Sequence, residues 1–201
     1  MELQDLLRRR KMVRSFRPDP VPPDVIATVM ESVLHAPSAG FTQGNEFLVL
    51  DSLAAIDDYI RLTDDPAYPV APEQLAVLPT LVVFPLSNRS SYLARYSDPD
   101  KIAFGLDDPD KWPAPFWDID AAMASMLILL TAIDNGLGGL FAGLSYGERE
   151  LLAHFGVPHE FRPIGVSHLG YPTDVDGQAP PASAFSRRRR SIDQLLHHNG
   201  W

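Results

Sequence analysis

Hydrophobic and polar positions follow two spacings along this chain, one helical and one strand-like. Apolar residues recur every three or four positions over 22–36, after a proline-rich opening, which predicts an amphipathic helix there. Short runs rich in β-branched and aromatic residues predict strands at 47–50, 80–86, 140–144 and 164–169. Further helices are expected at 2–10, 52–62, 118–135, 147–155 and 191–198, and a loop at 36–45. This order predicts an α+β domain with one sheet covered by helices.

The run 121–133 ("AAMASMLILLTAI") is the longest apolar stretch of the sequence. It is too short to span a bilayer and lies between Asp120 and Asp134, so we interpret it as a buried helix and expect no membrane partner. A helix that is apolar around most of its circumference must be covered on more than one side. The sheet would cover one side of this helix, and a second subunit would cover another, so the pattern favours a dimer.

Segment 88–117 breaks the pattern, because it is rich in Asp, Pro and aromatic residues without clear periodicity. We interpret it as a lid-like excursion from the core of a single domain, 1–201.

The sequence contains no cysteine, which excludes disulfides and thiolate metal sites. Its first residues lack the apolar run of a secretory signal, so we expect a cytoplasmic protein.

Basic residues gather in two islands of an acidic chain whose formal net charge is −9. The stretches 8–17 ("RRRKMVRSFR") and 186–191 ("SRRRRS") hold ten of the 17 Lys and Arg residues, whereas 18–186 holds seven against 23 acidic residues. The pI of about 5.0 argues against a nucleic-acid partner. If the chain ends meet, the islands would suit a phosphate monoester, because Arg donates bidentate hydrogen bonds to phosphate. Charge alone favours the alternative, in which both islands are solvated surface charge.

Motifs for catalysis by side chains are absent from the sequence. No histidine pair has metal-ligand spacing, so no metal site is expected, and there is no GxSxG elbow, P-loop or GxGxxG. The glycine-rich run 136–143 ("GLGGLFAG") is either a helix end that leads into a strand or backbone laid close against a flat ligand. A phosphate pocket without such motifs indicates that a cofactor carries the chemistry, and no side chain is predicted to be catalytic.

Five segments resemble, in order, motifs of the nitroreductase family. "RRKMVRSFRPDPVP" resembles the family's R-R-S-V-R-x-F opening, and "APSAGFTQGNEFLVL" resembles its A-P-S-A-G-N-x-Q-P-W-x-F segment. "DIDAAMASMLILLTAIDNGLGGLFAGL" is similar to its central dimer helix and the next strand, "RPIGVSHLGYP" to its P-I-G-x-x-x-L-G-Y-P strand, and "RRRRSIDQLLHHNGW" to its basic ending. The resemblance implies a mixed, mainly antiparallel sheet wrapped by helices, in an interlocked homodimer with two flavin mononucleotide (FMN) sites at the interface.

The resemblance also implies the residues of the FMN site. The FMN phosphate and ribityl chain would be contacted by Arg10, Lys11, Met12, Arg14, Arg187 and Arg189. The flavin of the other subunit would be reached by Pro37, Ser38, Ala39, Phe41 and Gln43. The flavin ring would lie along Phe141, Ala142, Gly143 and Leu144. An aromatic acceptor would be covered by Phe41, Tyr92, Trp112, Phe116 and Trp117, for which ordinary packing is the alternative. Asp118 and Asp120 are interpreted as helix N-terminal charges.

By the same resemblance, the chain is expected to be an FMN-dependent oxidoreductase with ping-pong kinetics. NAD(P)H would deliver hydride to flavin N5, and an electron-poor acceptor such as a nitroaromatic or a quinone would then be reduced. Phe41 stands where the family usually has Asn, and Gly44-Asn45 where it has Pro-Trp, which alters the loop near the ring. Two alternatives stay open: a divergent flavin enzyme (dehydrogenation, dehalogenation or flavin fragmentation) and a non-catalytic protein that binds or sequesters flavin.

Overall fold

The computed structural model describes residues 2–69, 77–174 and 189–201. Its α-helices are α1 (Leu3–Arg9), α2 (Pro23–Glu31), α3 (Leu53–Thr63), α5 (Arg89–Tyr96), α6 (Phe116–Asp134) and α7 (Glu148–His154). Its strands are β1 (Asn45–Leu50), β2 (Leu81–Ser87), β3 (Gly138–Ala142), β4 (Arg162–Pro163) and β5 (Val166–Gly170). Single 3₁₀ turns lie at Ser32–His35, Ala39–Phe41, Ile102–Phe104, Pro109–Lys111 and Ile192–Gln194.

The strands form one antiparallel sheet in the order β1-β2-β5-β3, with the short β4 paired to β2. The register runs from Asn45 opposite Ser87 to Leu50 opposite Val82, and Gly138 lies opposite Gly170 at the other edge. Beyond β3, Met12 forms a parallel bridge to Gly139, so the N-terminal segment extends the sheet. The α+β fold with an antiparallel sheet is confirmed.

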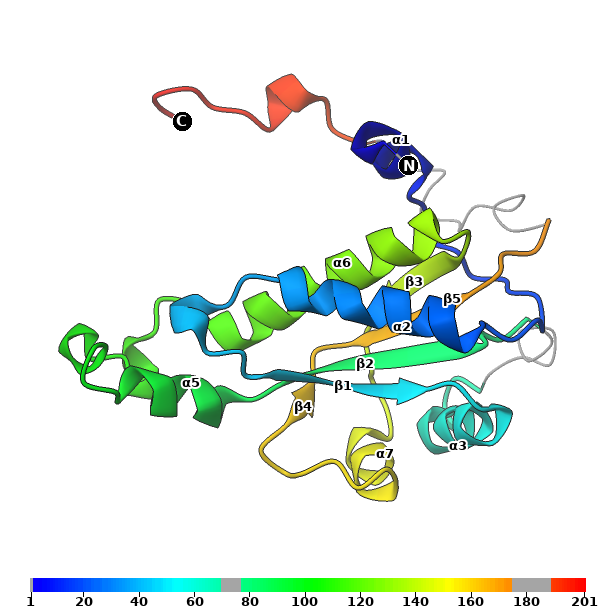
Figure 1. Ribbon diagram of the computed structural model, residues 1–201, viewed down its shortest axis with the longest axis horizontal. Helices are drawn as coiled ribbons and strands as arrows, with labels where there is room; N and C mark the ends of the chain where they lie inside the picture. Colours follow the sequence, from blue (N-terminus) through cyan, green and yellow to red (C-terminus); the bar gives the residue numbers. More distant parts are fainter. Residues whose placement is uncertain (1, 70–76, 175–188) are drawn as a thin grey trace.

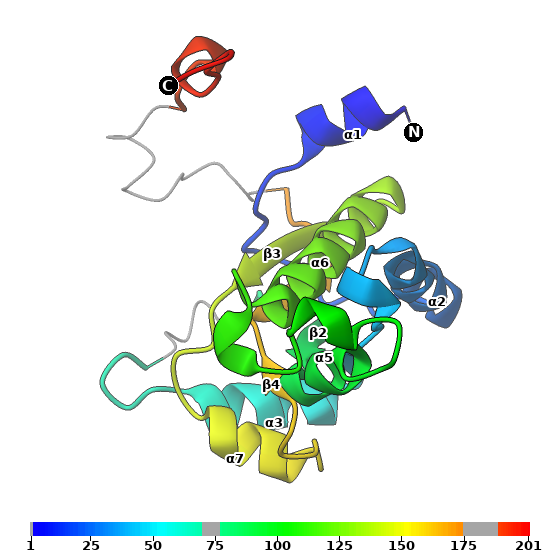
Figure 2. The same ribbon diagram turned by 90° about the vertical axis from the view of Figure 1, so that its left-hand side faces the viewer.

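Helices cover both faces of the sheet, as Figure 2 shows end-on. On one face α2 and α6 pack over Leu81, Val83 and Leu169, and on the other α3 and α7 pack over Val82 and Phe84. Successive residues of β2 therefore point into two separate cores, which explains why the whole strand is buried and all of it but Ser87 is apolar.

Helix α6 is the long apolar helix expected at 118–135, and it lies across the sheet (Figure 1). It is long and apolar enough to cross a membrane, but its buried residues pack in the core. Met123 and Met126 remain 40% and 45% exposed, and with the half-buried Leu130 and Ile133 they form a stripe at coiled-coil spacing. We call these four residues the α6 stripe.

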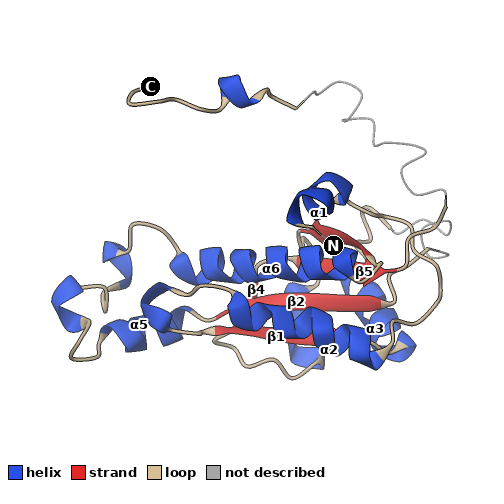
Figure 3. Cartoon of the chain, turned by 45° about the horizontal axis from the view of Figure 1, so that its top comes forward, coloured by secondary structure: helices blue, strands red, loops and turns tan. Residues whose placement is uncertain are grey.

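Two predicted elements differ in the structure. The helix expected at 191–198 is wrong, because only Ile192–Gln194 forms a 3₁₀ turn, and residues 189–201 stand clear of the sheet (Figure 3). The helix expected over 22–36 ends at Glu31 and continues as the turn Ser32–His35. The excursion 88–117 is more regular than expected, because α5 occupies its first part.

Candidate functional site

Backbone hydrogen bonds tie the basic N-terminal stretch to the sheet edge. The Val13 N–H donates to the Gly139 carbonyl (3.0 Å), and the Arg17 N–H donates to the Tyr171 carbonyl (2.8 Å). Val13 and Phe16 are buried, so the segment between α1 and α2 is held in place by packing as well. Arg14, between these anchors, is therefore presented beside β3 and β5.

A cavity of about 320 Å³ opens beside Arg14, and we call it the Arg14 cavity. Its lining residues are Arg14, Phe16, Tyr59, Ile60, Thr63, Val77, Leu78, Pro79, Leu140 and His168. Most of them are apolar, so the cavity suits an apolar group with a negative charge near Arg14. Such walls fit the ring and the anionic arm of FMN.

Two polar side chains meet in the wall of the Arg14 cavity. The Tyr59 hydroxyl lies 2.8 Å from His168 Nε2 in one hydrogen bond. Burial raises the pKa of Tyr59 to about 12 and lowers the pKa of His168 to about 4. Both groups are therefore uncharged at neutral pH, and Arg14 is the cation among the described residues that line this cavity.

The predicted phosphate contacts are divided between two hollows. Lys11 lines a second space of about 210 Å³, the Lys11 hollow, together with Arg9, Ile133 and Gly138. Extended backbone alternates its side chains, so Lys11 and Arg14 fall on opposite sides of the segment. Arg10 and Met12 are both half-buried. In the described residues, Arg14 and Lys11 thus line different hollows, and the predicted contacts of Arg10, Lys11, Met12 and Arg14 with the FMN phosphate and ribityl chain stay a prediction.

The C-terminal basic island lies outside these hollows. Arg187 lies outside the described residues, and Arg189 is exposed on the segment that stands clear of the body. The two chain ends project from the same side of the molecule in Figure 1, but the pocket linings near Arg14 and Lys11 include no described C-terminal residue.

The residues predicted to reach a second subunit surround a third space of about 260 Å³, the Phe41 hollow. It is lined by Val33, Leu34, Ala36, Pro37, Ser38, Phe41, Gln43, Asn45, Phe47 and Ala124. The Phe41 side chain is 77% exposed, and the Ser38 hydroxyl accepts a hydrogen bond from the Gln43 N–H (3.0 Å). Ala39 is half-buried behind this surface. Pro37, Ser38, Phe41 and Gln43 are thus brought together on one face.

The predicted ring contacts at the end of β3 differ in orientation. The half-buried Phe141 packs toward the α2–α6 core, whereas Ala142 and Leu144 pack toward the α3–α7 core. A Cβ added to Gly143 would meet no atom within 4 Å, so its backbone is open to a ligand. Gly138 and Gly139 instead allow side chains of this chain to pack closely against the strand. An added Cβ at Gly138 would lie 2.6 Å from Val13 Cγ2, and one at Gly139 would lie 2.7 Å from Leu129 Cδ2.

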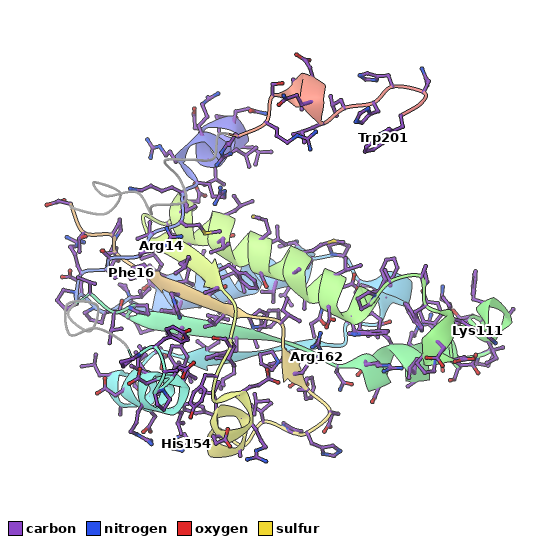
Figure 4. All side chains as sticks on the ribbon, turned by 180° about the vertical axis from the view of Figure 1, so that it is seen from behind. Arg14, Phe16, Lys111, His154, Arg162 and Trp201 are labelled. Carbon is purple, nitrogen blue, oxygen red and sulfur yellow. The ribbon has the colours of Figure 1, made fainter. Side chains whose placement is uncertain are left out.

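The aromatic residues of 88–117 pack mainly against one another. Tyr92 is completely buried, so its predicted contact with an acceptor is not supported by the structure. Trp112 contacts Tyr92, Phe116 and Trp117 with ring centroids 5.6 to 6.0 Å apart, and its Nε1–H donates to the Leu106 carbonyl. Figure 4 places Lys111 of this segment on the opposite side of the molecule from Arg14. The segment does not cover the Arg14 cavity.

Asp120 has a role that the sequence did not reveal. It is 2% exposed, and its Oδ2 accepts hydrogen bonds from the Ala39 N–H (2.8 Å) and the Tyr92 hydroxyl (2.7 Å). Its interpretation as a helix N-terminal charge therefore missed a tertiary contact. By contrast, Asp118 lies in the first turn of α6, where it accepts from Ser87 and Arg162. Among the described residues, no group of three His, Asp or Glu side chains could hold a metal ion.

Comparisons with known proteins agree with this architecture. The profile described as "Nitroreductase family" matches residues 7–171. A Bacillus subtilis protein named "Putative NAD(P)H nitroreductase YfhC" is 25% identical over 177 residues, 86% of each chain. A nitroreductase-like protein from Streptococcus mutans superposes with a TM-score of 0.74 at 17% identity over 97% of each chain.

A further solved structure, described as an FMN-dependent nitroreductase from Clostridium difficile, gives a TM-score of 0.69 at 17% identity. It covers 99% of this chain and 100% of its own. Since the family profile spans most of the sequence and the sheet, helices and loop order agree with these structures, the chain belongs to the nitroreductase family.

Proposed function

We propose that this protein is an FMN-dependent oxidoreductase that takes hydride from NAD(P)H and reduces an electron-poor acceptor such as a nitroaromatic or a quinone. The observation that carries the proposal is the Arg14 cavity, a mostly apolar space beside β3 with the Arg14 guanidinium in its lining. When bound, the flavin supplies the hydride-accepting centre. The chain supplies a place for the ring, positive charge for its phosphate arm and exclusion of water from one ring face.

We further propose that each site is shared between two copies of the chain. The Phe41 hollow and the Lys11 hollow both border α6, at Ala124 and Ile133 respectively. These positions are about 14 Å apart along the helix. In a two-fold dimer with antiparallel α6 helices, the Phe41 hollow of one copy would lie next to the basic N-terminal segment of the other, which carries both Lys11 and Arg14, so that Phe41 borders the flavin held by the partner copy's Arg14. The exposed α6 stripe supplies the apolar contact that such pairing needs.

The first experiment tests cofactor binding and turnover. The purified protein should absorb in the flavin region, and NADPH or NADH should bleach that absorption without oxygen. A protein that stays colourless after incubation with FMN would refute the proposal. A flavin that binds but is not bleached by either nucleotide would identify a binding or storage protein instead of an oxidoreductase.

The second experiment tests the assignment of Arg14. Arg14→Ala should weaken FMN binding about tenfold or more, because a charge-assisted hydrogen bond contributes about 1.5–3 kcal/mol. Arg17→Ala is the matched control, since Arg17 pairs with Asp19 and lies over the Tyr171 ring. Equal FMN affinities in the two variants would remove Arg14 from the site.

The dimer is tested by placing a charge in the α6 stripe. Met126→Asp should give a monomer by sedimentation and lose FMN, whereas Leu53→Asp, at an exposed apolar residue on α3, should change neither. A monomeric Met126→Asp variant that retains FMN would show that one copy is sufficient for binding.

A further inference from the structure

The turn Ala39–Phe41 carries a backbone conformation that needs support. The φ angles of Gly40, Phe41 and Gln43 are 63°, 56° and 52°, all in the left-handed region. Residues with bulky side chains rarely adopt this conformation, and it persists only where the surrounding structure fixes it. Because the Phe41 side chain is 77% exposed, the fixing contacts within this chain come from other residues.

Three contacts from distant parts of the chain meet at this turn. Asp120 Oδ2 accepts from the Ala39 N–H (2.8 Å), and Arg95 Nε donates to the Gly40 carbonyl (2.9 Å). The Tyr96 ring lies so close to Gly40 that an added Cβ would be 2.8 Å from its Cε2. Two peptide units of the turn, Ser38–Ala39 and Gly40–Phe41, are therefore each held by a hydrogen bond, and the Tyr96 ring packs against Gly40.

The residues that hold the turn are themselves fixed. The guanidinium of Arg95 donates two 2.8 Å hydrogen bonds to Asp100 and one of 2.9 Å to Asp98. The Tyr96 ring packs edge-on against Trp112 at 4.8 Å between centroids. Asp120 is buried on α6. Residues of the excursion 88–117 thus help to fix the conformation of the turn.

We propose that Arg95, Tyr96 and Asp120 are positioning residues that fix this turn and thereby make Phe41 the side chain that selects the acceptor. This inference rests on the proposed function, in which Phe41 faces the flavin of the partner copy. An aromatic side chain presented from a fixed backbone favours planar aromatic acceptors by stacking, and it leaves less space for bulky non-planar ones. A mobile Phe41 would lose this discrimination.

The positioning role is tested without flavin or substrate. The chain has no cysteine, so Phe41→Cys creates a single site for a nitroxide spin label. Adding Arg95→Ala should narrow the label's electron paramagnetic resonance spectrum, because the Gly40 carbonyl loses its donor. Arg89→Ala is the matched control, since Arg89 is on the same helix but lies over Trp117. Asp120→Asn keeps an oxygen acceptor for Ala39 and should leave the spectrum unchanged.

An unchanged spectrum in the Arg95→Ala variant would overturn the positioning role. The selecting role is tested in the protein with Phe41 intact. Arg95→Ala should raise the KM for a planar nitroaromatic about fivefold, the effect of one lost hydrogen bond, while NADPH reduces the flavin at the same rate. Phe41→Leu should remove the preference for planar acceptors, and Arg95→Ala should then have no further effect on KM.

A label that becomes mobile without any change in KM would overturn the selecting role. If the protein binds no FMN, the proposed function fails and the selecting role falls with it. The spectra would still decide whether the turn is fixed, so the two failures are distinguishable.

Discussion

Replacing Gly138 by alanine is expected to separate the N-terminal segment from the sheet. An added Cβ would lie 2.6, 2.8 and 2.9 Å from Val13 Cγ2, Cβ and Cγ1. Three contacts of this kind cannot be relieved by rotating one side chain, so Val13 must move. Val13 is 3% exposed, and its N–H donates to the Gly139 carbonyl, so this movement disturbs both packing and the bridge to β3.

The cost of this change is that of overpacking a filled core site, about 1–3 kcal/mol. For a chain of 201 residues, each kcal/mol lowers the melting temperature by about 2–4 °C, so a loss of about 4–8 °C is expected at the middle of that range. Arg14 follows Val13 directly, so the displacement should also weaken FMN binding. Stability and cofactor affinity are therefore expected to fall together.

Thermal unfolding and FMN titration of a double-mutant cycle check this prediction. Val13→Ala removes the two γ-carbons, so it should cost less stability in the Gly138→Ala background than in the parent, with a coupling of about 1 kcal/mol. Gly143→Ala is the stability control, because its Cβ would meet no atom within 4 Å. Additive effects, or a Gly138→Ala variant as stable as the parent, would refute the steric argument.

Two further predictions concern buried polar groups. Tyr92→Phe should lower the free energy of unfolding by about 1.5–3 kcal/mol, because buried Asp120 loses one of its two donors. Tyr146→Phe, at a side chain 43% exposed, should stay within about 0.5 kcal/mol, and equal denaturant midpoints for the two variants would contradict this. Burial lowers the pKa of His168 from 6.5 to about 4, so the unfolded chain takes up the proton first as the pH falls. The free energy of unfolding should therefore decrease from pH 6.5 to 4, by at most about 1.4 kcal/mol per pH unit. His168→Asn should remove this pH dependence. If the variant keeps the same pH dependence, other groups cause it.

The sequence predicted the elements that are buried by their own pattern. The apolar run at 80–86 became β2, and the run at 121–133 became the middle of α6, because both are long and apolar enough to require a core position. The C-terminal helix was predicted from a similar pattern but did not form. Residues 189–201 are all exposed in the described part of the chain, and a short helix is unstable without packing.

Sequence motifs could locate residues of the candidate site where local order decides their position, but they could not reveal its tertiary contacts. Motif order located Arg14 and Phe41, and the structure gives each of them a hollow. The separation of Lys11 from Arg14 could have been found, because side chains in extended backbone alternate. The role of Asp120 could not, since its partner Ala39 is 81 residues away and no local pattern marks the pair.

The bridge between Met12 and Gly139 also has a consequence for solubility. Strand β3 is the last strand of the sheet, and its outer edge carries backbone groups that could pair with a strand of another molecule. The N-terminal segment occupies part of that edge through the bond from Val13 to Gly139. A chain shortened past residue 13 would therefore expose an unpaired strand edge. We expect such a chain to aggregate during expression before any loss of catalytic rate can be measured.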